Sequence, residues 1–261
     1  MTIMDRFSLE GKIAVVVGGA GQIGRQTAQA YDEAGARVAV VDLVTDGVDE
    51  RFLTVPTDIL NPESVSDALA KVLDTYGQVD VLANHAHYKG DPRHLRPGHD
   101  FFAPFEKYPL EIWQSTIDVN LTGLFLSCQV FGTVLAERGS GSIINTSSTY
   151  GMVSAQHQIY GDSGINSPIG YATTKAAVLN FSRYLATYWA TKGVRVNTLS
   201  PGGVKNEGQS PEFRQEYESR TPLARMAEPD DYQGAMVFLA SEASAYMTGA
   251  NLVVDGGWTA W

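Results

Sequence analysis

The sequence predicts an α/β protein with a Rossmann-type, doubly wound parallel sheet of about seven strands, folded as a single domain over residues 1–261. Short runs rich in β-branched residues alternate with helical patterns from end to end, which is typical of βαβ units in a parallel sheet. The chain has 261 residues, of which 44% are hydrophobic, so it can bury a large core. No linker, internal repeat or low-complexity tract divides it, and we therefore expect one domain.

Each element is predicted from the local pattern, strands from β-branched runs between turn residues and helices from longer stretches with an apolar repeat of about 3.6 residues. The expected strands are Lys12–Gly18, Arg37–Val41, Phe52–Val55, Val79–Ala83, Ser142–Thr146, Val194–Ser200 and Asn251–Val254. The expected helices are Gln22–Ala34, Pro62–Tyr76, Leu110–Glu137, Pro168–Lys192 and Asp230–Ser241.

The connection between the second and third strands is unusually short. Only about seven residues, 44–50, join them. A right-handed parallel crossover generally needs about a dozen residues or more, including its helix. We expect this helix to be reduced to a loop or a single turn, which leaves one face of the sheet thinly covered.

Three irregular segments are expected to carry the substrate site, at about residues 86–107, 151–167 and 203–225. The first is interrupted by three prolines, and the second is rich in Gly, Ser and Gln. The first two follow the carboxyl ends of predicted strands, which is where open α/β sheets bind ligands. Long loops at that edge are more often functional than incidental.

Composition disfavours several function classes. The chain has 19 Lys and Arg against 29 Asp and Glu, so its net charge of −10 makes nucleic acid an unexpected partner. The single cysteine, Cys128, lies in an apolar helical stretch and is expected to be buried filler rather than a reactive thiol. There is no charged-then-apolar leader and no run of about 18 apolar residues, so we expect a cytoplasmic protein without membrane attachment.

A glycine-rich turn joins the first predicted strand to the first predicted helix. Its sequence is Gly18-Gly-Ala-Gly21-Gln-Ile-Gly24. Glycines permit the tight turn and let backbone N–H groups approach a pyrophosphate at the positive end of the helix. This position in the first βαβ unit predicts a dinucleotide site, although a plain βα turn that needs positive φ is the alternative.

Asp42 ends the second strand, eighteen residues after Gly24. A carboxylate there accepts hydrogen bonds from both hydroxyls of an adenosine ribose and repels the additional phosphate of NADP. No Arg or Lys lies among residues 18–24, and Leu43 follows the acid. These features favour NAD over NADP, with a simple strand-end cap as the alternative role for Asp42.

The chain resembles the short-chain dehydrogenase/reductase family over nearly its whole length. The landmarks are Gly18–Gly24, Asp58, Asn84, Asn120, the strand end Asn145-Thr-Ser-Ser148, Tyr171-Ala-Thr-Thr-Lys175, Pro201-Gly202 and the stretch from Thr248 to Gly257. A narrower resemblance, in Arg183–Trp189 and the ending Gly256–Trp261, is to bacterial members linked to sugar and surface-glycan metabolism.

The resemblance implies roles for individual residues. As catalytic residues it implies Asn120, Ser148, Tyr171 and Lys175. As cofactor-binding residues it implies Gly18, Gly21, Gln22, Ile23, Gly24, Asp42, Asp58, Ile59, Asn84, Ala86, Tyr171, Lys175, Pro201, Gly202 and Val204. As substrate-binding residues we expect Ser148, His87, Arg93, Arg96, Tyr150 and Lys205.

The sequence also departs from the family pattern. Val17 replaces a Thr, Gln22 a glycine and Asn206 a Thr, and the usual Asn-Asn-Ala-Gly is Asn84-His-Ala-His87. Between Ser148 and Tyr171 lie 22 residues, about ten more than the family pattern has, which leaves the catalytic serine open between Ser147 and Ser148.

The Tyr171 and Lys175 side chains lie one helical turn apart and suit proton transfer during hydride exchange. A tyrosine with an ordinary pKa near ~10 needs about 4 kcal/mol to ionise at neutral pH. An ammonium about 4 Å away supplies on the order of 4 kcal/mol at an effective dielectric of ~20. The oxidised nicotinamide adds further positive charge, so no other residue is required. The alternative for the pair is a solvent-exposed amphipathic face.

Residues 85–99 hold His85, His87, His94 and His99, four of the five histidines. Clustered imidazoles raise the possibility of a metal site, but the region has no Cys and few carboxylates, so no metal is expected. The same region carries three cations against one Asp, with Lys205, Arg214 and Arg220 following later. A basic rim on an acidic protein predicts an anionic substrate, unless these cations pair with surface carboxylates.

The expected function is NAD-dependent oxidation of a secondary alcohol, or reduction of the ketone, in a sugar, sugar acid or other anionic polyol. The alternatives are a nucleotide-sugar epimerase or dehydratase that retains NAD, and a non-catalytic NAD-binding regulatory protein. We also expect a homo-oligomer, most simply a tetramer, because two predicted helices are apolar on more than one face. The residues concerned are Leu121, Leu124, Phe125, Phe131, Val178, Phe181, Leu185 and Trp189.

Overall fold

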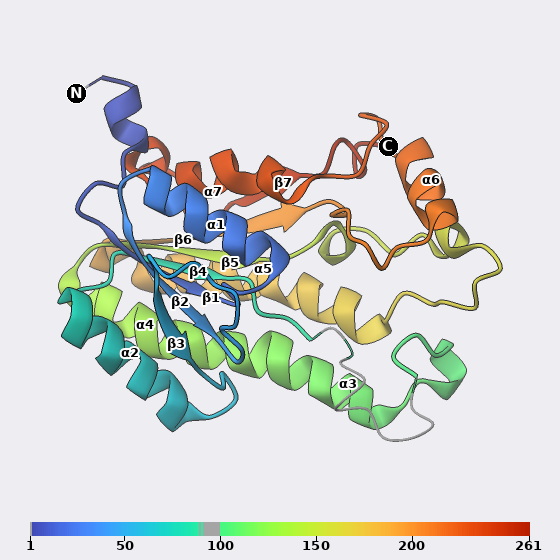
Figure 1. The fold of residues 1–261 in the computed structure, drawn as a ribbon, viewed down its shortest axis with the longest axis horizontal. Helices are drawn as coiled ribbons and strands as arrows, with labels where there is room; N and C mark the ends of the chain where they lie inside the picture. The colour runs from blue at the N-terminus through green and yellow to red at the C-terminus, as the bar shows by residue number, and fades with distance from the viewer. Residues whose placement is uncertain (1, 89, 91–99) are drawn as a thin grey trace.

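The computed structural model describes residues 2–88, 90 and 100–261. Seven strands form one parallel sheet in the order β3-β2-β1-β4-β5-β6-β7 (Figure 1). They are β1 Ile13–Val17, β2 Arg37–Asp42, β3 Leu53–Pro56, β4 Val81–Asn84, β5 Gly141–Thr146, β6 Val194–Pro201 and β7 Asn251–Val254. The predicted doubly wound architecture is confirmed.

Helices cover both faces of the sheet (Figure 1). The α-helices are α1 Gln22–Glu33, α2 Pro62–Tyr76, α3 Leu110–Ile117, α4 Leu124–Arg138, α5 Ile169–Trp189, α6 Pro211–Ser219 and α7 Gln233–Ala240. The 3₁₀ turns are η1 Met4–Phe7, η3 Phe105–Lys107, η5 Thr149–Gly151, η6 His157–Tyr160, η7 Ala190–Lys192, η8 Pro229–Tyr232 and η9 Glu242–Ser244, and η4 Asp118–Gly123 is a π-helical turn.

The alternation of side chains along β1 divides the core into two layers. Val15 and Val17 pack with α2, α4 and α5, whereas Ala14 and Val16 pack with α1 and α7. All five β1 residues are buried because helices lie on both sides of this strand. The carboxyl ends of the strands therefore meet at one edge between two helical layers, where a ligand site is expected.

The short crossover from β2 to β3 is also confirmed, since residues 43–52 contain no helix. Strand β3 adapts to the missing cover. Leu53 and Val55 pack toward α2, but Thr54 and Pro56, on the other face, are exposed. A polar residue and a proline are suited to an uncovered edge strand, because they discourage further strand pairing.

Several boundaries differ from the sequence-based expectations. The predicted helix Leu110–Glu137 is divided by the π-helical turn η4, because apolar periodicity does not report a one-residue widening of the helix. The predicted helix Asp230–Ser241 begins as a 3₁₀ turn, with a capping box between Glu228 and Asp231.

Two strands and one loop also need correction. The predicted strands Phe52–Val55 and Val79–Ala83 are Leu53–Pro56 and Val81–Asn84, since pairing with β2 and β1 fixes their register. Segment 203–225 is not entirely a loop. Ser210 caps the N-terminus of α6 by accepting from the Phe213 N–H at 3.2 Å, followed by Pro211 at the first helical position.

The longest apolar helical stretch, Leu110–Arg138, has the length and composition of a membrane span. Within the described residues, 56% of its most apolar window is buried in the fold. Phe131 and Leu135 are fully buried against the sheet. This stretch is a core helix of the domain.

Candidate active site

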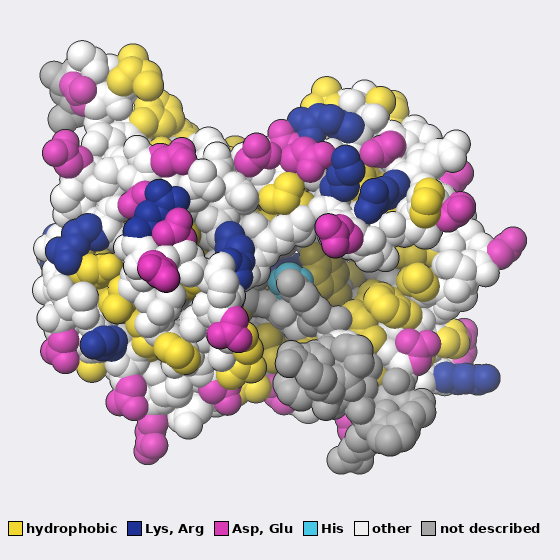
Figure 2. Space-filling model, viewed as in Figure 1, with side chains coloured by type: hydrophobic (Ala, Val, Ile, Leu, Met, Phe, Trp, Pro, Cys, Tyr) yellow, Lys and Arg dark blue, Asp and Glu magenta, His cyan; other side chains and the backbone are white. Residues whose placement is uncertain are grey.

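A cavity of about 1130 Å³ opens at the carboxyl edge of the sheet, between the glycine-rich turn and α5. Figure 2 shows this face hollowed near its centre, with a histidine side chain visible in the hollow. The lining side chains come from segments far apart in sequence. Those that the sequence predicted include Gly18, Gly21, Gln22, Ile23, Gly24, Asp42, Asp58, Ile59, Ala86, His87, Tyr171, Lys175, Pro201, Gly202 and Val204.

The glycine-rich turn requires two of its glycines for close backbone approach. A Cβ on Gly18 would lie 2.4 Å from the Ala86 nitrogen, and Gly18 has a φ of +74°. A Cβ on Gly24 would lie 2.2 Å from the Gly18 carbonyl oxygen. The turn ends at Gly21, the N-cap of α1, so the positive end of this helix faces the cavity.

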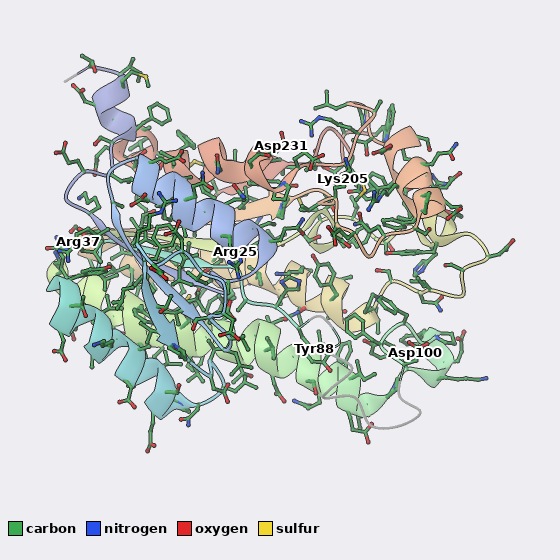
Figure 3. The ribbon with its side chains drawn as sticks, viewed as in Figure 1. Arg25, Arg37, Tyr88, Asp100, Lys205 and Asp231 are labelled. Atoms are coloured by element: carbon green, nitrogen blue, oxygen red, sulfur yellow. The ribbon has the colours of Figure 1, made fainter. Side chains whose placement is uncertain are left out.

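Asp42 and Arg25 both bind the backbone of Ala20 in this turn, one at its N–H and the other at its carbonyl. The Asp42 Oδ2 accepts from the Ala20 N–H at 3.0 Å, and the Arg25 Nε donates to the Ala20 carbonyl at 2.8 Å. The Arg25 guanidinium also donates to the Asp46 carbonyl at 2.9 Å and to the Gly47 carbonyl. Figure 3 labels Arg25 beside the first turn of α1.

The residues predicted from the sequence did not include Arg25, which lies one position beyond the glycine-rich turn at 18–24. An arginine in the first turn of a helix is electrostatically unfavourable, because the N-terminus is the positive end of the helix. This unfavourable position was the sequence feature that could have indicated a specific role for Arg25. Its contacts tie residues 46–47 of the short crossover to α1. Beside them, the exposed apolar side chains of Leu43, Val44 and Leu60 border the cavity.

Tyr171 and Lys175 both reach the cavity from α5. The Lys175 ammonium donates to the Thr146 carbonyl at 2.8 Å and lies 5.7 Å from the centre of the Tyr171 ring. The Tyr171 hydroxyl is hydrogen-bonded to Ser148. Ser147 instead donates to the Lys175 carbonyl at 2.6 Å. Of the two serines, Ser148 is therefore the one that contacts the tyrosine.

Burial dominates the protonation of this pair. Desolvation raises the pKa of Tyr171, and the hydrogen bond from Ser148 opposes that shift. Desolvation lowers the pKa of Lys175 to about 8, so the ammonium is the main form at neutral pH. The expectation that Lys175, together with the oxidised nicotinamide, offsets the cost of ionising Tyr171 did not include this burial, which acts against it.

Asn120 lies inside the π-helical turn, where the backbone is widened. Its Oδ1 accepts from the Tyr88 N–H at 2.7 Å, and its Nδ2 donates to the Thr174 hydroxyl at 2.9 Å. Asn120 thus joins the segment after β4 to the helix that carries Tyr171.

Asn84 and Val204, both predicted to bind the cofactor, form hydrogen bonds with other residues of the chain. The Asn84 Nδ2 donates to Asn145 at 2.9 Å, and its Oδ1 accepts from the Ser127 hydroxyl at 2.7 Å. The Asn84 side chain thus faces the core, and Asn84 is not among the residues that line the cavity. The Val204 carbonyl accepts from the Gln209 side chain at 2.9 Å.

Aromatic side chains gather beside Tyr171, where the inserted segment meets α6 and the end of the chain. Tyr217 stacks on Trp258 with ring centres 4.0 Å apart and planes at 10°, and Tyr160 stacks on Phe213 at 5.3 Å. Tyr150 packs on this cluster, and burial raises its pKa. The Tyr217 hydroxyl accepts from the Gly203 N–H at 2.6 Å, which ties α6 to the turn after β6.

The described cations of the predicted basic rim have protein partners. Lys205 forms an ion pair with Glu228 at 3.0 Å. Arg214 donates to the Asn206 carbonyl, and Arg220 pairs with Glu216 at 3.3 Å. Arg93 and Arg96 lie outside the described residues, as do His94 and His99. Across residues 2–88, 90 and 100–261, no three His, Cys, Asp or Glu gather as a metal site.

Comparisons with known proteins agree with this geometry. The family profile described as enoyl-(acyl carrier protein) reductase matches residues 18–259. D-threitol dehydrogenase of Mycolicibacterium smegmatis is 34% identical, over 97% of this chain and 95% of the relative. NAD-dependent glycerol dehydrogenase of Listeria innocua is 28% identical, over 97% and 96%. A crystal structure of a short chain dehydrogenase from Leptospira borgpetersenii with bound NAD⁺ is 36% identical, with a TM-score of 0.86 over 99% of this chain and 96% of that one.

Proposed function

The chain belongs to the short-chain dehydrogenase/reductase family, and from that premise we propose that it transfers a hydride between NAD and a secondary alcohol or ketone of a polyol or sugar. The observation that carries this proposal is one cavity lined at one side by the glycine-rich turn and Asp42 and at the other by Tyr171 and Lys175. When bound, the nicotinamide accepts the hydride in oxidation and returns it in reduction.

The residues of the cavity suit a dinucleotide. A side chain at Gly18 or Gly24 would clash with neighbouring backbone, so the tight turn needs both glycines, and the helix N-terminus beyond this turn attracts phosphate. Asp42 lines the cavity together with Leu43 and Val44, and the exposed apolar surface of these two residues suits an adenosine. Asp58 and Ile59 border the same end.

Proton transfer in the proposed reaction belongs to Tyr171. Its Oη takes the proton of the substrate hydroxyl in oxidation and donates it in reduction, while Ser148 holds the same substrate oxygen. Lys175 and the oxidised nicotinamide favour the phenolate electrostatically against the effect of burial. Asn120 donates a hydrogen bond to Thr174, the residue before Lys175, and so helps to hold the part of α5 that carries the lysine.

NAD is the proposed cofactor because the carboxylate of Asp42 repels a 2′-phosphate. The guanidinium of Arg25, which lines the same cavity, donates from all three of its nitrogens to backbone carbonyls.

Replacing Asp42 by Ala and Leu43 by Arg should raise the ratio of kcat/KM for NADP to that for NAD by about a hundredfold or more. The change removes a like charge and adds a partner for phosphate, and each charged hydrogen bond contributes about 1.5–3 kcal/mol. Steady-state kinetics with both cofactors measures the ratio. Asp46→Ala, which removes a carboxylate from the same loop, should leave it nearly unchanged. A wild-type preference for NADP would contradict the assignment.

We further propose a polyol or sugar as substrate, and among these an anionic one such as a sugar acid, because His87 lines the cavity and its segment of the sequence is rich in basic residues. The relatives that act on threitol and glycerol support the polyol class. A screen of polyols, sugars and sugar acids, followed by NADH absorbance, tests the function. Turnover of sugar acids at lower KM than the matching neutral polyols would support the anionic form. No NADH from any of them would contradict the proposed function.

We propose that the protein is a cytoplasmic homo-oligomer, in the simplest case a tetramer. Several apolar residues named from the sequence, including Phe131, Leu185 and Trp189, are buried within the chain's own core. The exposed apolar surface instead comes from Tyr184 and Tyr188 on α5, stacked at 5.9 Å and 63% and 59% exposed, and from Phe125 on α4, 47% exposed.

Changing Tyr184 and Tyr188 together to Glu should split the assembly, because it places two charges in the proposed apolar contact. Light scattering at micromolar concentration should then report a mass below that of the wild type. Lys71→Glu, on the exposed side of α2, is the control and should keep the wild-type mass. A wild-type protein with the mass of one chain would refute the oligomer.

A further inference from the structure

His85 places an unsatisfied polar atom in the wall of the cavity. The side chain is only 6% exposed, and its Nε2 has no hydrogen-bond partner. Five other side chains in the described part of the chain carry such an atom, but none of them borders this cavity. A buried polar atom without a partner is costly, and proteins keep one where a ligand or water completes the bond.

The imidazole is fixed at its other nitrogen. Nδ1 lies 2.8 Å from the Thr146 hydroxyl, and the carbonyl of the same threonine accepts from the Lys175 ammonium. The backbone of His85 is held by the Val17 carbonyl at 2.8 Å and lies directly behind Gly18. His85 therefore lies between the glycine-rich turn and the lysine, with one nitrogen bonded to Thr146 and the other buried beside the cavity without a hydrogen-bond partner.

The ring is a neutral hydrogen-bonding group. Burial, with a smaller contribution from the Lys175 charge, lowers the pKa of His85 to about 3. It therefore takes no part in proton exchange near neutral pH. Whether Nε2 donates or accepts a hydrogen bond depends on the tautomer that the Thr146 hydroxyl selects at Nδ1.

We propose that His85 is a cofactor-binding residue whose Nε2 hydrogen-bonds the nicotinamide-ribose half of the bound dinucleotide. This inference rests on the proposed function. It gives a role to His85, which stands where the family pattern Asn-Asn-Ala-Gly has its second asparagine. The nicotinamide half is favoured because His85 is coupled through Thr146 to Lys175, at the opposite end of the cavity from Asp42 and Leu43.

Two conservative variants separate the two nitrogens of the ring. An asparagine amide reaches the position of Nδ1 and keeps the Thr146 contact, whereas a glutamine amide reaches the position of Nε2. We expect His85→Asn to weaken NADH binding about tenfold, the effect of one lost hydrogen bond. His85→Gln should bind NADH within about threefold of wild type. Titration of NADH fluorescence, without substrate, gives both dissociation constants.

AMP tests which half of the cofactor is involved. Calorimetric titration should give the same AMP affinity for wild type, His85→Asn and His85→Gln, because AMP lacks the nicotinamide half. The exposed His157 supplies the matched control, and His157→Asn should bind both ligands as wild type does.

Thermal unfolding separates binding from a structural role. Because His85→Asn removes an unsatisfied buried nitrogen, the Tm without ligand should equal or exceed that of wild type, while the rise in Tm on adding NADH shrinks. Equal NADH affinity in wild type and His85→Asn would overturn the assignment. So would a joint loss of Tm, AMP affinity and NADH affinity. Failure of the wild type itself to bind NADH would instead overturn the proposed function.

Discussion

Tyr171→Phe should lower kcat by about a thousandfold or more and change the dissociation constant of NADH by less than about threefold. The substitution removes only the hydroxyl that carries the proton, and general acid–base catalysis contributes typically 10²–10⁴-fold. The ring stays in place beside His87, at a centre-to-centre distance of 6.1 Å. Stopped-flow turnover and NADH fluorescence measure the two quantities separately.

Tyr76→Phe is the matched control. Its hydroxyl also donates a hydrogen bond, to the Val38 carbonyl at 3.2 Å, but it lies on α2 away from the cavity. Activity should stay near the wild-type value. A Tyr171→Phe enzyme that retains more than a tenth of wild-type turnover would rule out Tyr171 as the proton carrier.

Lys175→Met should damage turnover and cofactor affinity together. The ammonium is the buried positive charge nearest Tyr171, and its loss removes both stabilisation of the phenolate and a charged donor toward the cofactor. A charged hydrogen bond contributes about 1.5–3 kcal/mol, so NADH should bind about tenfold to a hundredfold more weakly. Loss of turnover with unchanged NADH affinity would contradict a cofactor contact by Lys175.

The same variant has a second, pH-dependent effect on stability. The unfolded chain holds the Lys175 proton up to a pKa near 10.5, whereas the folded chain loses it near 8. Folding therefore becomes more favourable as pH rises between these values, by about 3 kcal/mol in total. The difference in unfolding free energy between wild type and Lys175→Met should grow by that amount from pH 8 to pH 10.5. Denaturant titrations at several pH values measure it, and a flat difference would contradict the burial of the charge.

The sequence was sufficient for the sheet, its two helical layers and the short crossover, because periodicity and connection length report them directly. Gly18 and Gly24 were also recognisable, since the turn that they form admits no other residue. In contrast, the widening of the helix at Asn120 depends on contacts with Tyr88 and Thr174, which are distant in sequence. No local pattern contains them.

Burial was the other quantity that the sequence could not supply. Distance alone suggested that Lys175 would suffice to lower the pKa of Tyr171, whereas the enclosing cavity raises it. The aromatic cluster of Tyr217 and Trp258 likewise joins the inserted segment, α6 and the chain end, which become neighbours only in the folded protein. The unsatisfied nitrogen of His85 can be identified only from a complete hydrogen-bond inventory.

The crossover at residues 43–52 gives the cofactor site an uneven stability. Between β2 and β3 the backbone is held by two turn hydrogen bonds, by Arg25, and by the ion pair of Arg51 with Asp32 at 3.0 Å, rather than by a helix. We expect such a segment to open locally at a free energy well below that of global unfolding, so that its amides exchange with solvent early. In the proposed complex, a dinucleotide resting on Leu43 and Val44 would close that opening. Part of its binding free energy would then order this segment, and we expect the hydrogen-exchange protection gained on binding to be concentrated in this one stretch of backbone.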